Sequence, residues 1–119
     1  MANITAQEVL TMVDTLLPNQ YTAEEKMRWL TQAEGYVLRE ICGEKDALPT
    51  LTAGSVLTVE APYDELYRHY LETQIHYANG ETARFNNAAA AWNSGFIAYR
   101  DYLARQELPH AAARALRLC

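Results

Sequence analysis

The stretch AAAWNSGFIAYRDYLARQE, residues 89–107, is the part of the sequence that decides the fold. Its apolar side chains recur every three or four residues, at Ala89, Trp92, Phe96, Tyr99 and Leu103, which places them on one face of an α-helix. Asn86 and Asn87, just before this stretch, can turn the chain and cap the helix. The sequence therefore predicts an amphipathic helix that ends near Glu107.

Another helix, the third in chain order, is predicted upstream of this stretch. Pro62 suits the first turn of a helix, and two acidic residues follow it near the positive end of the helix dipole. Helical spacing continues through Asn79 and Gly80, so we expect one helix over residues 62–85, in which a glycine costs only about 1 kcal/mol relative to alanine. The residues at this spacing are Leu66, Tyr70, Ile75, Ala78, Thr82 and Phe85.

Two helices precede this region, and each begins with a capping box. In Thr5-Ala6-Gln7-Glu8 and Thr22-Ala23-Glu24-Glu25, the threonine hydroxyl and the glutamate carboxylate can each bond to the other residue's backbone amide. Pro18 is expected to stop the first helix, and Gly43 is placed to end the second helix as a C-cap.

Residues 43–61, between the second and third predicted helices, lose the helical period. The runs 48–52 and 55–59 favour β-structure and flank Ala53 and Gly54. A connection of this length in a small domain is usually functional or mobile. We therefore expect a projecting β-hairpin or an ordered loop here.

These elements predict a single domain over residues 1–119, of mainly all-α class. The expected architecture is a four-helix bundle with a β-hairpin or long-loop insertion between helices two and three. Residues 108–119 form a C-terminal arm that is helix-competent but too short for a stable helix alone in water. We expect this arm to order on a partner.

The composition narrows the class of function. The formal charge of −5 argues against a protein that grips nucleic acid, because phosphate contacts need clustered lysine and arginine. No apolar run has the length of a membrane span and no signal-peptide pattern begins the chain, so we expect it to stay in the cytoplasm where it is made. Cys42 and Cys119 lack metal-site or redox spacing and are expected to be unpaired thiols.

One cluster on the third predicted helix could carry chemistry. Its members, Glu65, His69, Glu72 and His76, can share one helical face. A di-iron or di-manganese bundle needs Glu-x-x-His motifs on two helices, which this sequence lacks. We therefore expect a solvated face with the pairs Asp64–Arg68 and Glu72–His76. No catalytic residue, metal or cofactor is expected, and the protein is not expected to be an enzyme.

Tyrosine is abundant, with eight residues in the chain. Aromatic side chains with one polar end are enriched at protein interfaces. Because Tyr63, Tyr67 and Tyr70 span two faces of one predicted helix, at least one of them is expected to be free to meet another subunit. The tyrosines therefore favour oligomerisation.

Several segments resemble a known family. They are residues 12–21, MVDTLLPNQY, the Trp29-Leu30 pair, residues 62–70, PYDELYRHY, and residues 77–81, YANGE. Over roughly residues 5–107 the chain resembles the head-to-tail connector, or head-completion adaptor, family of tailed bacteriophages and prophages.

The resemblance implies a ring, expected to be a dodecamer, that docks beneath the portal protein and carries the stopper or a tail-completion protein. Genomic DNA would pass through its lumen without specific binding. The protein would lie in the neck of the virion after assembly in the bacterial cytoplasm. Partner contacts are expected at Leu48, Leu51, Val56, Val59, Tyr63, Tyr67, Leu108, Arg114, Leu116 and Arg117.

Two other functions remain open. A free-standing helical interaction module, such as a small regulator, would bind one protein partner and form no ring. A helix-turn-helix DNA-binding protein would use residues 18–21 as its turn, although acidic residues on the second helix offset its basic residues Lys26, Arg28 and Arg39.

Overall fold

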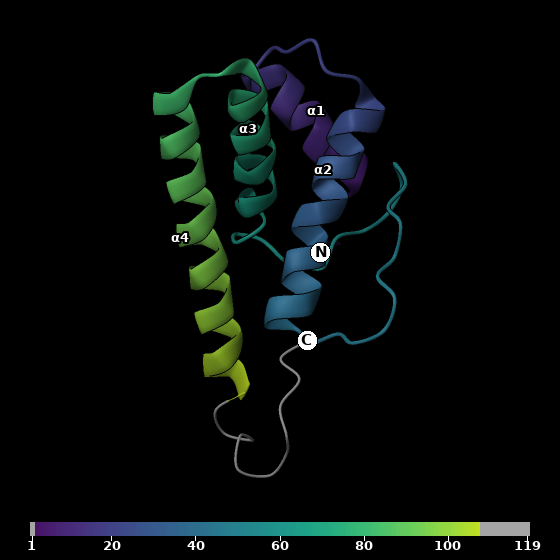
Figure 1. Ribbon diagram of the computed structural model, residues 1–119. Helices are drawn as coiled ribbons and strands as arrows, with labels where there is room; N and C mark the ends of the chain where they lie inside the picture. Colours follow the sequence, from purple (N-terminus) through teal and green to yellow (C-terminus); the bar gives the residue numbers. More distant parts are fainter. Residues whose placement is uncertain (1, 108–119) are drawn as a thin grey trace.

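The computed structural model describes residues 2–107, and the chain is mainly helical over this range (Figure 1). Its elements are α1 (Ala6–Leu16), α2 (Ala23–Tyr36), η1 (Val37–Ile41), α3 (Glu65–Asn79) and α4 (Thr82–Glu107). The predicted all-α class is confirmed. The predicted C-terminal arm lies outside the described residues.

Both predicted capping boxes form. The Thr5 hydroxyl accepts from the Glu8 amide at 3.2 Å, and the Glu8 carboxylate accepts from the Thr5 amide at 2.9 Å. Thr22 and Glu25 make the same two bonds at 3.1 Å each. Each box satisfies two amides that a helix start leaves without a partner, and a cap of this kind is worth about 1 kcal/mol.

The second helix continues without a break into η1, a turn of π-helix, and the chain turns away at Gly43, which has a φ of 72°. The predicted glycine end of this helix is therefore confirmed. Cys42, just before the turn, is buried and is not a free cysteine, so the expectation of an unpaired thiol is wrong at this position. Cys119 lies outside the described residues.

The prediction of one helix over 62–85 is wrong, because α3 ends at Asn79. Gly80 adopts the left-handed conformation, with a φ of 75°, and the Glu81 amide donates to the His76 carbonyl at 2.9 Å. This cap satisfies carbonyls at the end of α3, and only glycine adopts its backbone angles without strain. The chain then reverses and α4 begins, so Asn86 and Asn87 lie inside α4 and do not cap it.

Residues 43–61 do not form the predicted β-hairpin, and the described residues contain no strand. This segment pairs instead with the start of the chain through an isolated bridge between Thr5 and Val56. The amides of Ala6 and Gln7 donate to the carbonyls of residues 55 and 53, at 2.9 and 3.0 Å. The first amides of a helix lack partners within the helix, and this segment supplies them for α1. The segment is therefore packed against the body and does not project as a hairpin.

The core lies between α1, α2, α3 and the 43–61 segment. Its largest fully buried side chains include Leu30, Leu57, Leu66, Tyr67, Leu71 and Ile75. α4 packs chiefly on α3 and stands at one edge of the molecule (Figure 1). The two helices approach closely at Gly95, where a Cβ atom would lie 3.2 Å from the Leu66 Cβ.

Candidate interaction surfaces

A buried polar cluster fixes the 43–61 segment to the helices. One carboxylate oxygen of Glu34, on α2, accepts from the Tyr67 hydroxyl at 2.6 Å. The other accepts from the amide and the hydroxyl of Thr58 at 3.0 and 2.8 Å. The Tyr67 oxygen in turn accepts from the Val59 amide at 3.0 Å. Burial, followed by the charge of Glu34, raises the pKa of Tyr67, so this hydroxyl stays protonated and donates to Glu34.

Three of the residues that were expected to contact a partner are buried. Leu51, Val59 and Tyr67 are all buried in the core. A partner could not reach Val59 or Tyr67 without opening the fold, and Leu51 has only 7% of its surface exposed, at the edge of a hollow. Leu51 and Val59 were expected to be accessible because the 43–61 segment was expected to project, whereas it packs inward. Tyr67 was expected to be accessible because three tyrosines span two faces of one helix, and it lies on the buried face.

The other residues that were expected to contact a partner differ in how exposed they are. Val56 is 59% exposed, and Leu48 is partly buried beside α2. Tyr63 is partly buried, with its ring centroid 4.8 Å from that of Tyr102 on α4. Leu108, Arg114, Leu116 and Arg117 lie outside the described residues. Val56 is therefore the only one of the described predicted residues with a largely exposed side chain.

The tyrosines mostly join helices within the chain. Tyr70 packs edge-on against Trp92 of α4, at 4.9 Å between centroids, and its hydroxyl donates to Gln32 of α2 at 3.0 Å. Burial, followed by the charge of Glu60, raises the pKa of Tyr99 to about 12. None of Tyr63, Tyr67 and Tyr70 is largely exposed, so the predicted exposed tyrosine of that group is not found. The exposed tyrosines are Tyr36 and Tyr77.

An apolar groove runs along α2 where residues 48–53 pass beside it. It consists of two hollows of about 540 and 510 Å³, both lined in part by Arg28 and Thr31. Apolar lining residues of the two hollows include Leu10, Met27, Leu51, Tyr36 and Leu48. Glu24 borders the first hollow and Glu40 the second. The sequence does not indicate this groove, because the groove forms only when the 43–61 segment folds against α2.

The outward face of α4 is the second open surface. Between Arg84 and Arg100 this helix contains no charged residue, over about four helical turns. The exposed residues in this interval are Asn86, Asn87, Ala90, Asn93, Ser94, Ile97 and Ala98. Ile97 lies among them with 46% of its surface exposed. The run of uncharged residues is visible in the sequence, but its outward side is known only from the packing of α4 on α3.

The cluster of acidic residues and histidines on α3 forms ion pairs that differ from those predicted. Arg68 contacts Glu65 at 3.2 Å and Glu72 at 3.0 Å, in place of Asp64. His76 pairs with Glu81, across the turn, in place of Glu72. Burial, followed by the charge of Arg68, lowers the pKa of His69, which favours the neutral ring. Within residues 2–107, no group of three or more acidic, histidine or cysteine side chains could hold a metal ion.

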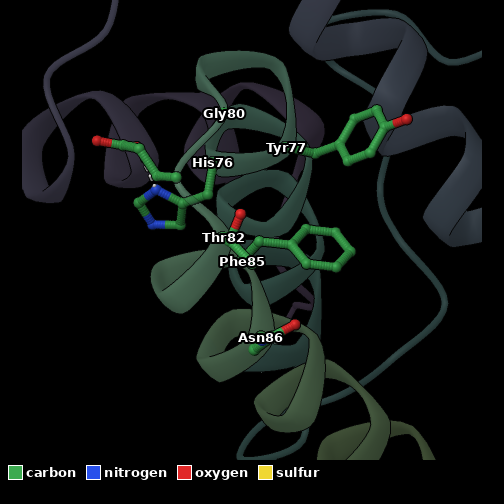
Figure 2. Close-up of a pocket in the computed structure, with 7 residues that line it drawn as sticks. His76, Tyr77, Gly80, Thr82, Phe85 and Asn86 are labelled. Carbon is green, nitrogen blue, oxygen red and sulfur yellow. Dashed lines mark hydrogen bonds and ion pairs between the residues drawn. The ribbon is translucent and has the colours of Figure 1, made fainter.

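A small pocket of about 300 Å³ lies at the turn between α3 and α4 (Figure 2). The His76 Nδ1 atom lies 2.8 Å from a Glu81 carboxylate oxygen, while the Tyr77 and Phe85 rings lie on the other side of the turn, 5.6 Å apart. Hydrogen bonds from His76 and Asn79 lower the pKa of Glu81. These contacts hold the turn closed, and they do not assemble a nucleophile with an activating base.

No protein-family model, curated protein or solved structure matches this chain. Among the described helices, none combines the length and the apolar character that crossing a membrane requires. A function is therefore inferred from the two open surfaces and from the resemblance of the sequence.

Proposed function

We propose that this protein is a structural subunit of the head-to-tail connector of a tailed bacteriophage. It would form a ring beneath the portal protein, joining the DNA-filled head to the stopper or tail. The observation that carries the proposal is the uncharged outward face of α4. The resemblance of residues 12–21, 62–70 and 77–81 to connector proteins supplies the specific function.

The environment of α4 supports a contact with protein. A helix that faces water on one side usually carries charged residues on that side. Charged residues are instead depleted at the centres of protein interfaces, where each would lose its hydration. A face of about four helical turns that exposes Ile97 among small and amide side chains therefore suits contact with protein.

A ring also requires two different surfaces on each subunit, because contacts repeated around an axis are heterologous. The α4 face and the α2 groove are two such surfaces. The formal charge of −5 suits a lumen through which DNA slides, since few cations are available to bind phosphate.

The apolar groove along α2 also suits the alternative function, a free-standing module that binds a partner helix. The helix-turn-helix alternative is weaker, because one of its basic residues is not available to phosphate. Lys26 is buried, and its ammonium group donates to Asp14 at 2.5 Å.

The test is the mass of the full-length protein in solution, measured by light scattering with negative-stain microscopy. It is measured alone and after mixing with the portal protein encoded by the same phage or prophage. Rings, alone or on the portal, are the expected result. A monomer or dimer that never enters a ring would contradict the proposal and favour the interaction module.

A further inference from the structure

We propose that the α4 face of one copy docks in the α2 groove of the next copy, and that this single contact, repeated, closes the ring. The inference rests on the proposed function and deepens it by naming the two surfaces that meet. The groove is defined by the two hollows beside α2, and the α4 face by the exposed residues between Arg84 and Arg100.

The positions of the two surfaces fit a head-to-tail contact. In Figure 1, α4 stands along one edge of the molecule and residues 48–53 lie toward the opposite edge, with α3 and α2 between them. A surface that pairs with itself would produce a closed dimer. With two complementary surfaces on opposite edges, a growing chain of copies always has a free groove at one end and a free α4 face at the other, so that it grows until the ends meet.

The shapes of the surfaces are also complementary. Ile97 is the large apolar side chain of the α4 face, and Ala90 and Ala98 on the same face have short side chains. Short side chains let a second backbone approach closely, and Ile97 can enter a hollow of about 500 Å³ in the floor of the groove. The partly exposed apolar side chains in the groove, Met27 and Leu48, then lose their contact with water.

Charged residues at the ends of the two surfaces match in sign and in spacing. Arg84 and Arg100 bracket the uncharged face of α4, and they are sixteen positions apart. Glu24 and Glu40, which border the two hollows, are also sixteen positions apart along α2 and η1. A helix rises about 1.5 Å per residue, so both pairs span roughly 24 Å. Sixteen residues also turn a helix by about 160° beyond whole turns, so the two arginines project from opposite flanks of the α4 face, and each long side chain can extend toward a glutamate at its own end of the contact.

The basic residues of the groove do not oppose this arrangement. Arg39 donates to the backbone carbonyl of Glu44 at 2.7 Å, which directs its charge toward its own chain. Arg28, at the centre of the groove, would face the uncharged middle of α4, where Asn93 and Ser94 offer oxygen acceptors. Within the single chain, Arg84 pairs with Glu81 and Arg100 pairs with Asp101, each at 3.4 Å. These pairs are exposed and contribute little stability, so both arginines can exchange them for a glutamate of the next copy.

The test uses two variants of the full-length protein, each with one blocked surface. Thr31→Arg places a long cation where the two hollows meet, and Ile97→Arg places one at the centre of the α4 face. Each variant alone is expected to lose self-association and ring formation. An equimolar mixture is expected to form a complex with the mass of two subunits, because the intact groove of one variant accepts the intact α4 face of the other.

The matched control is Leu16→Arg, which adds the same charge at an exposed residue at the end of α1 that lines neither hollow, and it should assemble like the wild type. Circular dichroism establishes that all three variants are folded. Rings formed by Thr31→Arg at wild-type yield would overturn this inference and leave the connector function standing. If Ile97→Arg fails to assemble while Thr31→Arg assembles normally, the contact is a symmetric one between two α4 faces. That result also overturns this inference.

The outcomes separate this inference from the proposed function. In one possible outcome, the wild-type protein self-associates and the two variants complement each other, but no ring forms on the portal. That outcome would support this contact and contradict the connector function. Wild-type protein that stays monomeric both alone and with the portal would contradict both.

Discussion

The Tyr67 hydroxyl on α3 donates a hydrogen bond of 2.6 Å to Glu34 on α2, and both residues are buried. The same tyrosine oxygen accepts from the Val59 amide. A single phenol thus joins two helices and the 43–61 segment.

Tyr67→Phe is expected to destabilise the protein by roughly 1–3 kcal/mol. The substitution keeps the ring but leaves a Glu34 oxygen and the Val59 amide without their buried partner. Urea unfolding followed by circular dichroism measures the change. Tyr77→Phe is the matched control, because Tyr77 is 71% exposed, and its free energy of unfolding should stay within about 0.5 kcal/mol of the wild type.

Gly80→Ala is expected to cost about 1–2 kcal/mol in the free energy of unfolding, because φ at this position is 75° and an L-residue is strained there. Gly54→Ala is the control, since an added Cβ would meet nothing within 4 Å and φ there is not positive. Equal stability of the two variants would contradict the assigned role of Gly80 as the cap of α3.

Gly95→Val is expected to destabilise the contact between α3 and α4 by about 1–3 kcal/mol. Even a single added Cβ would lie 3.2 Å from the Leu66 Cβ, and valine adds two methyl groups beyond it. Thermal unfolding measures the loss of stability. Ala98→Val, on the exposed side of the same helix, controls for the lower helix propensity of valine.

Acid is expected to weaken the contact between α1 and α2. Burial acts to raise the pKa of Asp14, but hydrogen bonds from Lys26 and Asn19 outweigh it, and the pKa falls below its ordinary value of 3.8. The folded state therefore holds the proton less tightly than the unfolded state. The stabilisation is fully present above pH 3.8 and is lost as the pH falls through the lower, folded-state pKa.

The measurement is the free energy of unfolding from roughly pH 6 to pH 2.5. Asp14→Asn should be less stable than the wild type at neutral pH, because it removes the charge that faces the buried Lys26 ammonium. The difference should shrink toward the acid end. A difference that stays constant with pH would show that the carboxylate charge of Asp14 is not what stabilises the fold.

The sequence predicted correctly those features that depend on neighbouring residues. Both capping boxes lie within four consecutive residues, and the apolar faces of the helices follow from local spacing. The helix boundary at Gly80 was missed because both flanks keep helical spacing. The reversal depends on the left-handed cap and on the return of α4 along α3.

The 43–61 segment and the candidate surfaces depend on distant contacts. The alternating apolar residues of this segment suggested a projecting hairpin or an ordered loop, but its backbone partners are residues 4–7, and nothing in its own sequence specifies them. The groove needs α1, α2 and residues 50–53 together. Leu51 and Val59 were therefore selected as partner contacts when they are core residues.

The bonds between the beginning of α1 and residues 53–55 also tie together two parts of the chain that are far apart in sequence. The Ala6 and Gln7 amides, which have no partner within the helix, donate to carbonyls nearly fifty positions later. These amides meet water only when residues 53–55 leave α1. Amide hydrogen exchange at Ala6 and Gln7 therefore reports the opening of a segment that lies elsewhere in the sequence.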